Sequence, residues 1–132
     1  MKTYFIDTNY FLRLLLRDNE TQFQTVYNLF QKAIQEKIKI STSVVVFFEL
    51  YWVLTSFYQN NKKNCTIYLD KILQMDFLEI ENREFLDEAL KLYLNYPLDL
   101  EDSYNLAYYI NRNLDEFATF DKQILKINKK SS

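Results

Sequence analysis

Short runs of β-favouring residues alternate with helical segments along this chain. Four such runs are present, at Thr3–Ile6, Ile38–Ser41, Phe77–Ile80 and Glu116–Thr119, and a helical segment follows each of them. Strands that are separated by helices are joined by crossover connections, which produce parallel pairing and a sheet covered on both faces. We therefore expect a three-layer α/β domain with a four- to five-stranded parallel sheet flanked by helices.

The helical segments show apolar residues at helical spacing. In the second of them Phe23, Val26 and Phe30 recur on one face, which predicts one packed side and one hydrated side. We expect a single domain over residues 1–127 and a frayed polar tail over residues 128–132. The predicted helices are Tyr10–Leu16, Glu20–Lys37, Val44–Tyr58, Lys62–Met75, Arg83–Tyr96, Leu100–Asn113 and Lys122–Ile127.

The 132 residues include no glycine and no histidine. Without glycine there is no phosphate-binding glycine loop or dinucleotide fingerprint, and left-handed helix ends are expected to use asparagine, at Asn60–Asn61, Asn95 and Asn113. Without histidine, His-ligated metals and Ser–His or Cys–His catalysis are excluded. Any acid–base or metal chemistry must therefore use carboxylates.

Charge and hydropathy restrict the partners and the compartment. The net charge of −2 gives no overall basic field, so that bound cations would have to help if the partner is RNA. The apolar run before Asp7 is too short for a signal peptide, and Val44–Leu54 is too short for a membrane span. The single Cys65 cannot form an internal disulfide. We expect a cytoplasmic protein without membrane contact.

Glu49 is the most informative acid. It lies within an apolar run, and its helical neighbours three and four residues away include no Lys or Arg. An unpaired buried carboxylate costs several kcal/mol, so this position indicates either a partner from elsewhere or a function. The alternative is an exposed glutamate on the solvent side of the helix.

Three aspartates lie where strands end or helices begin. Asp7 and Asp121 each follow a predicted strand, so the carboxyl ends of parallel strands would bring both to one sheet edge. Asp102 lies in the first turn of a helix with Asp99 as the expected N-cap. A capping or helix-dipole role would also explain acids at these positions.

Several carboxylates meeting in one pocket repel one another unless cations bind among them. Hard oxygen ligands without His or Cys favour Mg²⁺ or Mn²⁺ over zinc. Such ions support phosphodiester cleavage by activating water, without a nucleophilic side chain. The set therefore predicts a metal-dependent nuclease site composed of Asp7, Glu49, Asp102 and Asp121.

Four short motifs in this order and spacing resemble the PIN-domain nucleases, particularly VapC-type toxins of toxin–antitoxin systems. They are Asp7-Thr8-Asn9, Phe48-Glu49-Leu50-Tyr51-Trp52-Val53-Leu54, Leu100-Glu101-Asp102-Ser103-Tyr104 and Thr119-Phe120-Asp121-Lys122. The resemblance covers nearly the whole chain and implies a PIN-like fold. It departs from the family at Asn113-Leu114-Asp115, where members often carry glycine.

The resemblance implies an endoribonuclease that uses Mg²⁺ or Mn²⁺, with the four acids as metal ligands and Asp7 as the central one. It also implies that Thr119 and Asn9 orient carboxylates and water, that the protein is a homodimer, and that a cognate antitoxin inhibits it. Asp99 is a possible substitute for the third acid, although the Asp102 register fits the family better.

Two other functions fit parts of this sequence pattern. An aspartate-nucleophile phosphatase needs a second Asp two positions after the first, where this chain has Asn9. A catalytically inert interaction module would keep the fold without needing all four acids. A basic rim for RNA has the candidates Arg13, Arg17, Lys122 and Lys126, each of which is also explained as an ordinary surface cation.

Overall fold

The computed structural model describes the backbone of residues 1–131 and the side chains of residues 1–128. The chain forms two compact units, unit 1 (Met1–Asn82) and unit 2 (Arg83–Ser132). The predicted α/β class is confirmed, with seven α-helices and one parallel sheet among the described residues.

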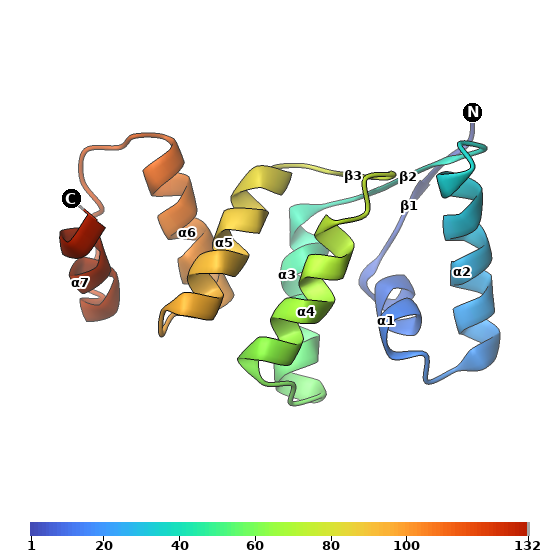
Figure 1. Ribbon diagram of the computed structural model, residues 1–132, viewed down its shortest axis with the longest axis horizontal. Helices are drawn as coiled ribbons and strands as arrows, with labels where there is room; N and C mark the ends of the chain where they lie inside the picture. Colours follow the sequence, from blue (N-terminus) through green and yellow to red (C-terminus); the bar gives the residue numbers. More distant parts are fainter. Residues whose placement is uncertain (132) are drawn as a thin grey trace. The chain divides into compact units, whose positions relative to one another are not determined.

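Unit 1 contains a three-stranded parallel sheet and four α-helices (Figure 1). Strand β2 lies between β1 and β3, so β1 and β3 are the two edge strands of this sheet. In chain order its elements are β1 (Thr3–Phe5), α1 (Thr8–Leu16), α2 (Glu20–Ile34), β2 (Lys39–Thr42), α3 (Val44–Trp52), the π-helical turn η1 (Val53–Phe57), α4 (Lys62–Leu73) and β3 (Leu78–Ile80).

One face of this sheet is covered by helices. Tyr4, Ile40 and Leu78 are in register across the strands, and the last two are buried. On the opposite face Phe5 and Glu79 are exposed. Both crossovers run in the same direction along the sheet, and right-handed crossovers of that kind place their helices on one face. Within residues 1–82 the helices therefore cover one face of the sheet, and the third layer predicted for the whole domain stays a prediction.

Unit 2 is helical throughout its described part. Its elements are α5 (Arg83–Asn95), α6 (Leu100–Asn111) and α7 (Lys122–Ser131). Helix α5 packs along α6, while Leu98, Leu106, Ile124 and Ile127 form a buried cluster that joins α6 to α7. Helix α7 continues beyond the predicted end at Ile127, and of the predicted tail only Ser132 lies outside the described residues.

The predicted strand at Glu116–Thr119 is not formed. These residues belong to no helix or strand, and unit 2 has no strand in its described part with which they could pair. The Phe117 ring instead packs edge-on against Tyr109, with ring centroids 5.2 Å apart, and contacts the α7 cluster. The sheet therefore has three strands, not the predicted four or five, because β-favouring residues form a strand only beside a pairing partner.

The chain makes its left-handed turns without glycine. Positive φ angles occur at Arg17, Glu36, Gln59, Asn82 and Asn113. Of the predicted asparagines only Asn113 has this conformation, while Asn61 caps α4 by accepting a hydrogen bond from the Asn64 N–H. A left-handed residue other than glycine costs about 1–2 kcal/mol, which neighbouring contacts must offset.

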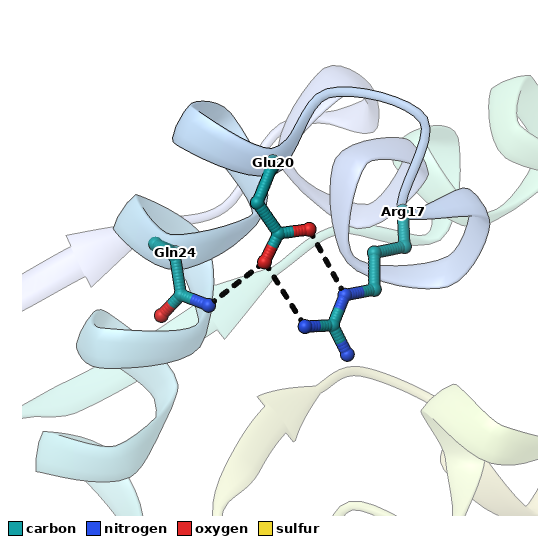
Figure 2. Close-up of polar contacts among 3 residues, drawn as sticks. All are labelled: Arg17, Glu20 and Gln24. Atoms are coloured by element: carbon teal, nitrogen blue, oxygen red, sulfur yellow. Dashed lines mark hydrogen bonds and ion pairs between the residues drawn. The ribbon is translucent and has the colours of Figure 1, made fainter.

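Arg17 shows how such contacts form at the corner between α1 and α2 (Figure 2). Its guanidinium donates two hydrogen bonds to the Glu20 carboxylate, at 3.1 and 3.0 Å, and lies over the Phe23 ring, 4.1 Å from its centroid. Gln24 donates to the same carboxylate at 3.1 Å. These bonds lower the pKa of Glu20 to about 2.

The end of β1 is fixed by β2. The Ile6 N–H donates to the Ser41 carbonyl at 2.8 Å, and the buried Thr42 hydroxyl donates to the Ile6 carbonyl at 2.7 Å. Both backbone polar groups of Ile6 are therefore bonded to β2, and the chain leaves the sheet at the next residue, Asp7.

None of the helices formed by the described residues has both the length and the apolar character required to cross a bilayer.

We expect the stability of the wild type to fall more steeply than that of Glu20→Gln as the pH decreases from about 4.5 to about 2. The pKa of Glu20 is lowered from 4.5 in the folded state, so its contribution is complete above 4.5 and is lost as the pH approaches 2. The difference should be small because the pair is exposed. Urea unfolding across this range tests it, and parallel stability curves would contradict it.

Thr42→Val should destabilise the protein by about 1–3 kcal/mol, because it leaves the buried Ile6 carbonyl without its donor. Urea denaturation measures this change. Thr66→Val in α4 is the matched control, since the Thr66 hydroxyl donates only to the Lys62 carbonyl of its own helix. Equal losses of stability in the two variants would show that the hydrogen bond to Ile6 contributes no more than one within a helix.

Candidate active site

Asp7 lies at the carboxyl end of β1 and is exposed. Its Oδ1 accepts a hydrogen bond from the Tyr10 N–H at 3.1 Å, so Asp7 is the N-cap of α1. The capping interpretation of this residue is therefore correct. Its second oxygen, Oδ2, accepts no hydrogen bond from the side chains and backbone that the structure describes, and it remains available to a ligand.

Asn9 and Glu49 are the other candidate residues of unit 1. Asn9 is exposed in the first turn of α1 and lines a small cavity with Arg13. Glu49 lies on the outer face of α3, where Val45 and Trp52 are also exposed, by 73% and 61%. No Lys or Arg within residues 1–82 forms an ion pair with Glu49. Of the two predictions for Glu49, a buried carboxylate and an exposed glutamate on the solvent side of the helix, the structure shows the second.

Asp99 and Asp102 begin α6 in unit 2. The Asp99 carboxylate accepts a hydrogen bond from the Asp102 N–H at 2.8 Å, which confirms Asp99 as the N-cap. Asp102 is half-buried. Its pKa is raised, first by loss of hydration and then by the negative charges of Asp99 and Asp121. Within unit 2 the negative charge of Asp121 therefore acts on Asp102.

Asp121 caps α7 as Asp7 caps α1. Its Oδ1 accepts hydrogen bonds from the N–H groups of Gln123 and Ile124, at 2.8 and 3.1 Å. The Thr119 hydroxyl accepts a hydrogen bond from the Asp121 N–H at 3.0 Å. The hydroxyl proton of Thr119 can still be donated, which suits the orienting role that the resemblance implies for this residue.

Asp7 and Asp121 therefore share one arrangement, in which one carboxylate oxygen holds a helix end and the other is unbonded among the described residues. Ionised carboxylate oxygens are the donors that Mg²⁺ and Mn²⁺ prefer. Considered one unit at a time, however, no three acidic side chains of the described residues lie close enough to hold a metal ion. The convergence of all four acids therefore stays a prediction.

Two of the four candidate basic-rim residues already form ion pairs with carboxylates. Arg13 pairs with Asp18 at 3.0 Å and donates to the Tyr58 hydroxyl at 3.3 Å, and Arg17 is held by Glu20. Lys122 and Lys126 are exposed. The arginines of α1 thus have structural contacts that the sequence did not reveal.

Thr42 is the positioning residue that the sequence did not indicate. Its hydroxyl fixes Ile6, the residue before Asp7, although 36 positions separate the two residues. The sequence showed only a threonine next to the end of a predicted strand. Which backbone group its hydroxyl bonds depends on the strand register, which the sequence did not give.

No curated protein and no solved structure matches the chain. The PIN domain family matches residues 4–130, which is nearly the whole sequence. This match agrees with the parallel α/β architecture and with acids at strand and helix ends. The chain therefore belongs to the PIN domain family, a family of nucleases that typically use a divalent metal ion.

Proposed function

We propose that this protein is a metal-dependent endoribonuclease and the toxin of a type II toxin–antitoxin pair. The observation that carries the proposal is that Asp7 and Asp121 each use only one carboxylate oxygen to cap a helix. The chain that carries them belongs to the PIN domain family. Each is held rigid by a helix that it caps and keeps one oxygen for a cation.

The proposed metal site consists of the four acids that the family resemblance implies. Its ligands would be Asp7, Glu49, Asp102 and Asp121. When bound, Mg²⁺ or Mn²⁺ would supply an activated water and would stabilise the charge of the leaving oxygen. The pKa of Asp102 is raised first by loss of hydration and then by the charges of Asp99 and Asp121, and a nearby cation would offset both effects.

The side chains around the acids have complementary tasks. Thr119 is fixed beside Asp121 and retains a proton for donation to water or to a phosphate oxygen. Asn9 presents an exposed amide two residues after Asp7, and this amide can orient the attacking water. Neither residue supplies a nucleophile, and the proposed chemistry requires none.

RNA is the proposed substrate, and a cognate antitoxin and a second copy of this chain are the proposed protein partners. The exposed apolar side chains on α3 and η1 support a protein-binding surface, since Trp52 is 61% and Phe57 is 73% exposed. The inert-module alternative would also use such a surface. Only activity distinguishes the two functions.

Cleavage of a pool of cellular RNAs tests the proposal. We expect cleavage with Mg²⁺ or Mn²⁺, none with EDTA, and a rate about 100-fold lower for Asp7→Asn because a metal ligand loses its charge. Asparagine caps helices as well as aspartate does, so this variant should fold normally.

Asp115→Asn is the matched control, because it removes an exposed carboxylate outside the proposed site. Equal cleavage by the wild type with and without EDTA would exclude metal catalysis here. Failure to cleave any RNA, together with tight binding of a partner protein, would favour the inert module.

Glu49→Gln should lower cleavage strongly while leaving stability within about 0.5 kcal/mol of the wild type. The reason is that Glu49 is exposed and unpaired within residues 1–82, so a neutral side chain of the same shape costs the fold little. Thermal melts in the absence of metal measure the stability. A large fall in melting temperature would instead identify a structural ion pair at Glu49.

A further inference from the structure

Helices α1 and α3 carry the three candidate residues of unit 1. Asp7 caps α1 and Asn9 lies in its first turn, whereas Glu49 lies on α3. The two helices begin after the carboxyl ends of the neighbouring strands β1 and β2, and they pack against each other (Figure 1). The position of Glu49 relative to Asp7 therefore depends on how α3 is held against α1.

An arginine with two partners joins α1 to the helix that follows α3. In the last turn of α1, the Arg13 Nη2 donates to the Tyr58 hydroxyl at 3.3 Å, and the Arg13 Nη1 pairs with Asp18 at 3.0 Å. Asp18 lies in the corner between α1 and α2. A planar guanidinium can serve both partners at once in a fixed geometry. The Arg13 side chain is only 21% exposed, so water competes weakly for these contacts.

Tyr58 is rigidly continuous with the helix that carries Glu49. Its N–H closes η1 by donating to the Val53 carbonyl at 3.1 Å, and η1 follows α3 without a break. The backbone N–H and the side-chain amide of Asn60 both donate to the carbonyl of the buried Leu54, at 2.9 and 3.2 Å. A bond to the Tyr58 hydroxyl is therefore a bond to the end of the α3–η1 helix.

We propose that Arg13 and Tyr58 are positioning residues, whose mutual hydrogen bond holds Glu49 at the distance from Asp7 that a shared metal ion requires. The inference rests on the proposed function, because it takes Asp7 and Glu49 as ligands of one ion. Neither positioning residue contacts that ion or the substrate. Both act only through the angle and the register between α1 and α3.

The packing of the two helices explains why such a bond is needed. Their buried side chains are mainly apolar, with Phe11 and Leu12 on α1 and Phe47 and Leu50 on α3. Apolar burial has no preferred direction, whereas a hydrogen bond forms only at a defined distance and angle. A polar link between the helices therefore selects one register among those that apolar packing allows.

The fluorescence of Trp52 measures metal binding without any cleavage of RNA. Trp52 is the only tryptophan of the chain, and it is exposed on α3 three residues after the exposed Glu49. Residues at this spacing are neighbours on a helix, so a paramagnetic Mn²⁺ ion bound at Glu49 should quench the Trp52 emission. Mg²⁺ does not quench, and added Mg²⁺ should restore the emission by displacing Mn²⁺. This reversal separates binding from collisional quenching.

We expect Tyr58→Phe, which removes only the hydroxyl, to raise the Mn²⁺ concentration of half-maximal quenching about five- to tenfold. The reason is that groups which orient metal ligands commonly contribute about 10–100-fold to metal affinity. In a Glu49→Gln background the same substitution should shift this midpoint less than about twofold, because the ligand that it positions is already lost. A merely structural role would give equal shifts in both backgrounds.

Tyr68→Phe is the matched control. Tyr68 on α4 is half-buried like Tyr58, and its hydroxyl forms no hydrogen bond within the described part of the chain. This variant should bind Mn²⁺ as the wild type does. If urea unfolding without metal shows that Tyr58→Phe is poorly folded, Arg13→Gln replaces it. Arg13→Gln breaks the same bond from α1 and should raise the midpoint at least as far.

The outcomes separate this inference from the proposed function. An unchanged midpoint in Tyr58→Phe, or equal shifts with and without Glu49, would overturn the positioning role and leave the nuclease in place. A shift that depends on Glu49, in a protein that cleaves no RNA, would support the positioning role and overturn the nuclease. A wild type without quenching that Mg²⁺ reverses would overturn the metal site and the positioning role together.

Discussion

The pairing of β1 with β2 decides where the first acid lies. Ser41 and Thr42 bond both backbone polar groups of Ile6, so β1 cannot fray at the point where it leads into Asp7. Asp7 then turns the chain into α1 by accepting a hydrogen bond from the Tyr10 N–H. In enzymes a displacement of about 1 Å at a reacting group costs roughly 100-fold in rate. A buried threonine on another strand is therefore as relevant to the site as the residues beside Asp7.

Capping a helix and binding a metal are compatible tasks for one carboxylate. An ionised carboxylate has about four acceptor positions, and the caps formed by Asp7 and Asp121 occupy positions on only one oxygen each. The positive end of the helix dipole also favours the ionised form that a cation requires. A capping role is therefore no argument against a catalytic one. The cap fixes the side chain, and the remaining oxygen is presented in a defined direction.

Sequence patterns predicted the helices and their caps better than they predicted strand pairing, side-chain exposure and long-range hydrogen bonds. Helical periodicity identified all seven α-helices, and the caps at Asp7 and Asp99 follow from local chemistry. The strand predicted at Glu116–Thr119 failed because pairing requires a neighbour that no local pattern encodes. The exposure of Glu49 was only the alternative prediction, because α3 carries apolar side chains on its outer face as well. Thr42 was missed because its role depends on strand register. The meeting of the four acids remains a prediction.

The proposed RNA substrate would bind to an almost neutral chain without a strong basic field. The net charge is −2, and Arg13 and Arg17 are already paired with carboxylates. Counterion release can therefore supply only a small part of the affinity. A bound cation at the proposed metal site would reverse the local repulsion near Asp7.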